Sequence, residues 1–343
     1  MITIYPKQAY NLTLKALRAK LTPMLIGSPG IGKSDLIKKV AEKTNLKVID
    51  LRLSQMDPIM LSGLPFMSEG DTRSEFIPPA YFPLEGDTIP DGYNGWLLLF
   101  DEINQASASI QAASYKIILD RMVGQIPLHK NVAIVAAGNL ATDRAITHKM
   151  GTALQSRMVH LQLAIDTNQW IEWGNKNNID YRVLAYINFK PDALHIFDPS
   201  HNDCTFSCPR TWKFLSDILK NEQTISLDIL PLMAGTVSEG VAREFYAFCS
   251  IFDDLITLPE IMEDPQNVVM PIEPSTIFAL TSMIANSIKE SNAKQLIVFV
   301  ARMPIEFQMI CLKQAIMKNT ELLSCAAFKE WIVVNGEDLF GEV

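Results

Sequence analysis

The sequence predicts an α/β protein with a three-layer core around a parallel sheet, followed by a helical part. Three short apolar runs predict buried parallel strands at 23–26, 96–100 and 132–137. A glycine-rich segment joins the first run to a predicted helix at 35–43. Further along the chain, apolar residues recur at helical spacing, as in 241–255 and 275–287.

The predicted elements divide the chain into three parts. We expect the α/β core to span residues 1–163, beginning with a basic amphipathic helix at 7–20. A helical lid is expected at 164–255 and a helical C-terminal extension at 256–343. The apolar run 295–300 would suit a strand, but among helices we interpret it as the buried face of another helix.

Composition and charge exclude several classes of protein. Hydrophobic residues make up 48% of the 343 residues, yet no apolar stretch approaches the roughly 20 residues of a membrane span. The N-terminus has no continuous apolar segment, so we expect no signal peptide and a cytoplasmic location. Five widely spread cysteines are expected to be reduced.

The net charge of the chain is −8, which disfavours general electrostatic binding to nucleic acid.

The first apolar run ends in a loop that suits a phosphate chain. Its sequence, GSPGIGKS, matches the pattern G-x-x-x-x-G-K-S/T. Backbone N–H groups of such a loop and the N-terminus of the next helix face phosphate oxygens. Lys33 would reach the β and γ phosphates, and Ser34 would bind Mg²⁺. The predicted nucleotide-binding residues are Gly27, Ser28, Pro29, Gly30, Ile31, Gly32, Lys33 and Ser34, with Asp101. A glycine turn that merely joins a strand to a helix is the alternative.

The second apolar run leads directly into Asp101 and Glu102. Acidic residues at the carboxyl end of a parallel strand lie where such sheets bind ligands. We predict that Asp101 holds Mg²⁺, directly or through water, and that Glu102 orients and deprotonates the attacking water. Solvated acids that only cap the strand are the alternative.

The third apolar run brings Gly138 and Asn139 to the same edge of the sheet. Asn139 is therefore a candidate for holding the γ-phosphate or the attacking water. An asparagine after a strand is often a plain turn residue. The presence of the other two motifs favours the functional interpretation.

Four segments carry a resemblance to a known family. GSPGIGKS, LLLFDEINQAS, VAIVAAGN and ALQSRM, in this order and spacing, resemble the AAA+ ATPases, and within them the MoxR-like or dynein-related branch. The resemblance covers about residues 10–220 and implies a P-loop NTPase core that binds ATP and Mg²⁺. It further implies ATP hydrolysis in a homo-hexameric ring and chaperone-like remodelling of a protein client, often beside a partner with a von Willebrand factor A domain. Residues 61–95, rich in Gly and Pro, stand where this branch carries a pore-lining insert.

The resemblance also implies two catalytic arginines. Arg157, directly before the expected last core strand, stands where the family carries the arginine that reaches the ATP of the neighbouring subunit. Arg144 is the alternative for that role, and a surface ion pair is the alternative role for Arg157. Arg210, in a Cys-Pro-Arg segment at a helix start, resembles the arginine that contacts the γ-phosphate of its own subunit; capping of a neighbouring group is its alternative.

Two further functions stay open at the level of the sequence. Related rings act on DNA, so a DNA motor is one alternative, although the acidic balance weighs against a nucleic-acid partner. A scaffold that binds ATP and barely hydrolyses it is the other. The intact Lys33, Asp101 and Glu102 argue against the scaffold.

Overall fold

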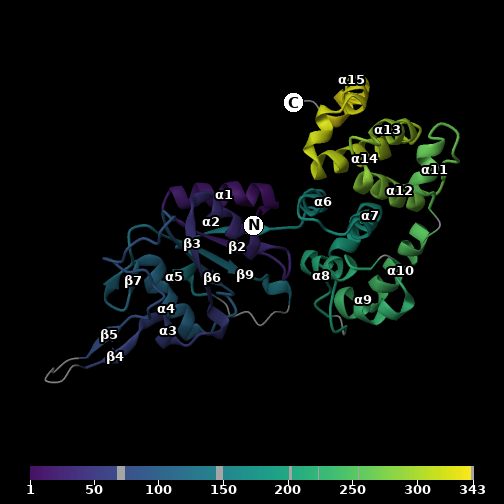
Figure 1. Cartoon of the computed structure of the whole chain (residues 1–343). Coiled ribbons are helices and arrows are strands. Elements are labelled where there is room, and N and C mark those ends of the chain that lie inside the picture. Colours follow the sequence, from purple (N-terminus) through teal and green to yellow (C-terminus); the bar gives the residue numbers. More distant parts are fainter. Residues whose placement is uncertain (68–73, 144–149, 201–202, 223, 254, 341–343) are drawn as a thin grey trace. The chain divides into compact units, whose positions relative to one another are not determined.

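The computed structural model describes residues 1–343 except 68–73, 144–149, 201–202, 223, 254 and 341–343 (Figure 1). The chain divides into two compact units. Met1–Asp166 with Asp198–Ser200 form an α/β unit, and Thr167–Phe197 with His201–Val343 form a helical unit. The fold class predicted from the sequence is confirmed. The separation of the helical part into a lid and an extension stays a prediction.

The α/β unit is built on a six-stranded parallel sheet with the strand order β1-β10-β2-β9-β6-β3. These strands are β1 (Thr3–Ile4), β2 (Thr22–Ile26), β3 (Leu46–Arg52), β6 (Gly95–Asp101), β9 (Val132–Gly138) and β10 (Met158–Leu163). The helices of this unit are α1 (Pro6–Arg18), α2 (Lys33–Thr44), α3 (Pro58–Ser62), α4 (Ala108–Leu119) and α5 (Thr152–Gln155).

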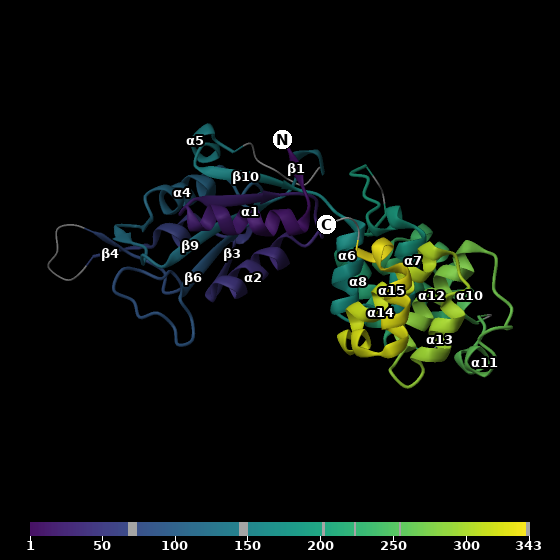
Figure 2. The ribbon, with the colours of Figure 1, turned by 90° about the horizontal axis from the view of Figure 1, so that it is seen from above.

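Helices cover both faces of this sheet, which explains why its central strands are continuous apolar runs. On β6, Leu97 and Leu99 belong to a core shared with α1 and α2. Leu98 and Phe100 belong to a second core, shared with α4. Figure 2 shows α1 and α2 side by side along the sheet. The alternation produces the three predicted layers.

Two short antiparallel hairpins extend the α/β unit. β4 (Leu64–Phe66) pairs with β5 (Glu75–Ile77) inside the predicted insert, and β7 (Met122–Val123) pairs with β8 (Ile126–Pro127) directly before β9. Main-chain hydrogen bonds join the end of the insert to the second hairpin: the N–H of Glu85 donates to the Pro127 carbonyl over 2.9 Å. The second hairpin was not predicted from the sequence.

The helical unit contains ten α-helices among its described residues, and none of them is long and apolar enough to span a membrane. They are α6 (Thr167–Lys176), α7 (Tyr181–Phe189), α8 (Pro209–Leu219), α9 (Leu230–Val237), α10 (Glu239–Asp253), α11 (Leu258–Glu263), α12 (Pro274–Ser287), α13 (Ala293–Val300), α14 (Ile305–Lys318) and α15 (Ala326–Phe340).

A buried ion pair anchors the start of α7. Asp180 caps this helix by accepting from the Arg182 N–H over 2.9 Å, and its carboxylate also pairs with the Arg182 guanidinium at 2.8 Å. Both side chains are only 5% exposed. Arg182 also donates to the carbonyl of Leu219 at the end of α8 over 2.7 Å. The pair therefore fastens α7 to α8, next to the aromatic packing of Tyr186 on Trp212.

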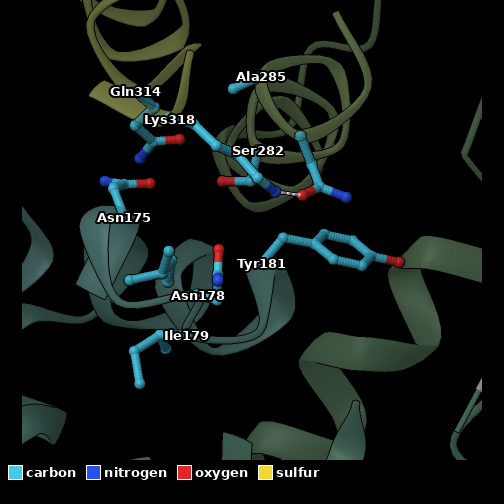
Figure 3. Close-up of a pocket in the computed structure, with 10 residues that line it drawn as sticks. Asn175, Asn178, Ile179, Tyr181, Ser282, Ala285, Gln314 and Lys318 are labelled. Carbon is cyan, nitrogen blue, oxygen red and sulfur yellow. Dashed lines mark hydrogen bonds between the residues drawn. The ribbon is translucent and has the colours of Figure 1, made fainter. Parts of the chain in front are cut away.

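A small polar pocket lies between the α6–α7 junction, α12 and α14 (Figure 3). Ser282 Oγ and Gln314 Nε2 are buried here without a hydrogen-bond partner among the described residues. Burial lowers the pKa of the neighbouring Lys318 ammonium, which donates to the side-chain oxygen of Asn286. Buried polar groups of this kind are ordinarily satisfied by ordered water. We therefore expect the pocket to be hydrated.

Asp180→Ala should lower the free energy of unfolding by about 3 kcal/mol or more, because it removes the carboxylate partner of a buried guanidinium and a helix cap. Urea unfolding followed by tryptophan fluorescence measures the effect. Glu239→Ala is the control, since it breaks an exposed i,i+4 pair with Arg243 and should cost less than about 1 kcal/mol. A loss no larger than that of the control would show that the buried pair does not anchor α7.

Candidate functional site

The glycine-rich loop runs from the end of β2 to the start of α2. Gly32 is the N-cap of α2 and has φ 93°, in the left-handed region that favours glycine. At Gly27, a Cβ atom would lie 2.7 Å from the carbonyl oxygen of Leu163 in β10, so the close approach of the backbone excludes a side chain. The loop thus turns sharply between the strand and the helix, as the motif requires.

The ammonium of Lys33 lies at the centre of the site. Its Nζ donates to the carbonyls of Gly27 and Ser28 over 2.7 and 2.9 Å and to Asn139 Oδ1 over 2.9 Å. The side chain is buried, at 8% exposure. One positive charge therefore links the glycine-rich loop to the residue that follows β9.

A hydroxyl and a carboxylate meet beside this lysine. Ser34 Oγ donates to Asp101 Oδ2 over 3.0 Å, and Asp101 Oδ1 accepts from the Glu102 N–H over 2.9 Å. Oxygen ligands of these two kinds are the ones that Mg²⁺ prefers. The donor set at the end of β6 therefore fits the predicted Mg²⁺ site.

Both the backbone conformation and a side-chain hydrogen bond fix the position of Glu102. Its φ of 58° lies in the left-handed region, which is uncommon for a residue other than glycine. Its Oε2 accepts a hydrogen bond from the hydroxyl of Ser54. Ser54 belongs to a short 3-10 helix, Leu53–Gln55, that directly follows β3. The sequence offered no signal for this contact, because a serine after a strand is ordinary.

A third carboxylate, Asp50 of β3, contributes to the electrostatics of this edge. Burial, and then the negative charge of Asp101, raise the pKa of Asp50, while Arg52 and Lys38 act in the opposite direction. The Glu102 carboxylate adds a smaller upward effect. Negative charge therefore accumulates on the carboxyl side of β3 and β6, where a cation would be stabilised.

Arg157 lies between α5 and β10 with its side chain folded back on its own segment. Its Nη1 donates to the Ala153 carbonyl over 2.6 Å and to Ser156 Oγ over 3.1 Å. The guanidinium carbon lies 4.7 Å from the centre of the Tyr115 ring in α4. These contacts bring Arg157 next to α4; its role towards a neighbouring subunit stays a prediction.

Arg210 and Arg144 are the other two arginines that the sequence analysis considered. Arg210 is exposed on the first turn of α8, after Pro209 at the helix start, and belongs to the helical unit. Its contact with a γ-phosphate stays a prediction. Arg144, the alternative to Arg157, lies outside the described residues.

The structure brings together the three motifs that the sequence singled out. Ile26 pairs with Gly138, and Phe100 pairs with Ala136, so β2, β9 and β6 end side by side. Lys33 donates to Asn139 over 2.9 Å, and the next residue, Ser34, donates to Asp101 over 3.0 Å. These features define the class of protein: an α/β protein with a P-loop site for a nucleotide phosphate chain.

The AAA domain family (dynein-related subfamily) matches residues 23–158, from β2 to the start of β10. Over these residues the match agrees with the resemblance seen in the sequence. No curated protein sequence matches the chain at a significant level.

Two solved structures show a distant likeness. A provisionally assigned ATPase of Cytophaga hutchinsonii is 14% identical, with 96% of this chain and 88% of that chain covered and a TM-score of 0.37. A mutant RuvB of Thermotoga maritima is 17% identical, with 81% and 80% covered and a TM-score of 0.35. At these scores the assignment of the core rests on the family match and on the geometry of the site.

Ser54→Ala should raise basal ATP turnover several-fold, because the Ser54 hydroxyl occupies one oxygen of the carboxylate that is predicted to act as the base. Steady-state phosphate release at saturating ATP measures the effect. Ser62→Ala, which removes an exposed hydroxyl bound to the Pro58 carbonyl, is the matched control. Turnover that is unchanged, or that falls, would show that Ser54 does not restrain Glu102.

Proposed function

We propose that this protein hydrolyses ATP with Mg²⁺ in a ring-shaped homo-hexamer and uses the cycle to remodel a protein client. The observation that carries the proposal is the meeting of Lys33, Ser34, Asp101 and Asn139 at the ends of three neighbouring parallel strands, with Glu102 next in the chain. Phosphoryl transfer to water needs a charged lysine, a metal-binding pair, a base and an amide, and these groups lie together at one edge of the sheet. We also propose a cytoplasmic location.

Each side chain would have a definite task in hydrolysis. Lys33 would neutralise the β and γ phosphate oxygens, and Asn139 would orient the γ-phosphate or the attacking water. Ser34 and Asp101 would hold Mg²⁺, which would supply further charge neutralisation at the phosphates. Glu102 would accept a proton from the attacking water on the carboxylate oxygen that Ser54 does not occupy. Catalysis would thus consist of positioning and charge stabilisation.

The two arginines would complete the charge balance. We propose that Arg157 serves the site of the adjacent subunit and Arg210 the site of its own. Leaving the Tyr115 ring would cost Arg157 about 0.5–1 kcal/mol, the usual value of such a contact at a partly exposed position. This is small enough for a catalytic cycle to supply.

An exposed apolar surface on the insert supports a protein client. Five large apolar side chains of the β4–β5 hairpin are between 40% and 61% exposed: Leu64, Phe66, Met67, Phe76 and Ile77. Exposed apolar patches of this kind mark interaction sites. The net charge of −8 disfavours a nucleic-acid partner. A protein with a von Willebrand factor A domain is the partner class that the resemblance suggests.

Phosphate release assayed with and without Mg²⁺, and with single-stranded or duplex DNA, tests the proposal. We expect Mg²⁺-dependent hydrolysis that DNA leaves within a factor of about two, with sedimentation velocity in ATP reporting the hexamer. Strong stimulation by DNA would favour a DNA motor instead. Binding of ATP without hydrolysis would favour a nucleotide-regulated scaffold.

Two substitutions should separate binding from chemistry. Lys33→Ala should weaken ATP binding and abolish turnover, since it removes the buried cation of the loop. Glu102→Gln should keep ATP bound while hydrolysis falls about 10²- to 10⁴-fold, because an amide cannot act as a base. Nucleotide titration and phosphate release are the measurements. Lys43→Ala, at the exposed end of α2, is the control for the first change. Unchanged affinity and turnover in Lys33→Ala would overturn the assignment.

Arg157→Ala should leave ATP bound and stop hydrolysis, because an arginine supplied by a neighbour is worth about 10³ to 10⁵ in rate. In a mixed ring, a Lys33→Ala subunit still offers its Arg157 to an Arg157→Ala neighbour with an intact loop. Mixing the two inactive proteins should therefore restore some activity. Normal hydrolysis by Arg157→Ala would refute the role, and Arg144→Ala would then be the variant to test.

A further inference from the structure

The side chain of Asn104 makes two hydrogen bonds to the main chain of one residue, Asn139. Asn104 Nδ2 donates to the Asn139 carbonyl over 2.7 Å, and Asn104 Oδ1 accepts from the Asn139 N–H over 3.1 Å. A planar amide that binds both polar groups of one residue fixes the position and the orientation of that residue. Asn104 lies three positions beyond Asp101, in the turn between β6 and α4.

This contact continues the pairing of β6 with β9 beyond the last residues of the two strands. The N–H of Ile103 donates to the Ala137 carbonyl over 3.1 Å, and the Asn104 amide takes up the next polar groups, at Asn139. The turn that carries Asn104 is itself closed by the N–H groups of Gln105 and Ala106, which both donate to the Glu102 carbonyl. The Asn104 side chain therefore makes the hydrogen bonds that the main chain of a further β6 residue would make to β9.

Close packing leaves the Asn104 amide little freedom. The residue is 9% exposed, and a Cβ atom at Gly138 would lie 2.6 Å from Asn104 Oδ1 and 2.9 Å from its Cγ. The Asn104 amide therefore occupies the space that a side chain at position 138 would need. An ionised carboxylate in place of the amide would accept from the Asn139 N–H but could not donate to the carbonyl, so the site is matched to a neutral amide.

The side chain of Asn139 points from this fixed main chain to the ammonium of Lys33, whose Nζ lies 2.9 Å from Asn139 Oδ1. We propose that Asn104 is a positioning residue: without touching the nucleotide, it fixes the Asn139 main chain so that the Asn139 amide is aimed at Lys33 and the phosphates. The proposal rests on the proposed ATPase function of the same site. It connects the turn after Asp101 to the glycine-rich loop through Asn139.

A double-mutant cycle tests whether Asn104 acts through Asn139. We expect Asn104→Ala to lower kcat about ten- to a hundredfold, the range found for residues that orient other site residues, while KM and ATP affinity change less than about threefold. Asn139→Ala should lower kcat by at least as much. The protein with both substitutions should be no slower than Asn139→Ala alone, because Asn104 would then have no amide to aim.

Several outcomes of the cycle would overturn the inference. A kcat near the wild-type value in Asn104→Ala is one of them. Losses that multiply in the doubly substituted protein are another, because they would show that Asn104 acts independently of Asn139. Failure of the proposed function would look different: the wild-type protein would not hydrolyse ATP, or Asn139→Ala would keep full turnover.

Asn131→Ala is a matched control for general effects on the sheet. The Asn131 amide also donates to a main-chain carbonyl, that of Asn94, over 2.9 Å, but it does so at the opposite ends of β6 and β9. We expect its kcat to stay within about twofold of the wild-type value, whatever its stability. A loss of kcat equal to that of Asn104→Ala would show that any loosening of these strands has the same effect, and would overturn the specific role.

Asn104→Asp keeps the shape of the side chain and makes the two hydrogen bonds depend on pH. A purely structural role of Asn104 would not predict this pH dependence of kcat. The protonated carboxyl can donate its O–H to the Asn139 carbonyl while its C=O accepts from the Asn139 N–H, whereas the ionised form cannot donate. Its kcat, divided by that of the wild type at each pH, should therefore rise as the pH falls. A ratio that is flat, or that falls towards acid, would contradict the role assigned to the two hydrogen bonds.

Discussion

The lateral alignment of β2, β9 and β6 is the constraint on which the site depends. The glycine-rich loop, Asn139 and Asp101 follow these three strands, and each strand contributes one part of the site. A slip of one residue would move a side chain by about 3.3 Å along its strand, more than a hydrogen bond of 2.9 Å tolerates. Two separate cores hold this alignment, because successive residues of β6 are packed into different ones.

The turn between β6 and α4 connects three neighbouring strands through side chains. Glu102 accepts from Ser54, which follows β3, and Asn104 binds the main chain that follows β9. Asp101, at the end of β6, accepts from Ser34 at the start of α2. One short stretch of chain, residues 101–104, therefore contains Asp101 and Glu102 and contacts both Ser34 and Asn139.

The sequence predicted the parts of the fold that have a strong local pattern and missed those that depend on distant neighbours. Continuous apolar runs identified β2, β6 and β9, and the glycine-rich motif located the start of α2. β3 was missed because it is an edge strand with polar residues between its apolar ones. The β7–β8 hairpin is too short to leave a pattern. The run at 295–300 could have been a strand or a helix, because it contains β-branched residues; in the structure it is part of α13.

The same distinction applies to the site. Lys33, Ser34, Asp101, Glu102 and Asn139 could be named because their spacing from strand ends is a local property. Ser54 and the two-sided contact of Asn104 could not, since a serine or an asparagine in a turn has many ordinary roles. Their partners are 48 and 35 positions away along the chain, so only the folded chain reveals them.

The position of β9 between the hairpins and the site has a mechanical consequence. β9 begins after the β7–β8 hairpin, to which the insert is hydrogen-bonded, and it ends at the residue before Asn139. Its backbone is extended and paired on both sides, with β2 and β6, so it can neither shorten nor buckle without breaking a ladder. A force applied to the hairpins along this strand would therefore be transmitted to the carboxyl end of β9, where Asn139 follows.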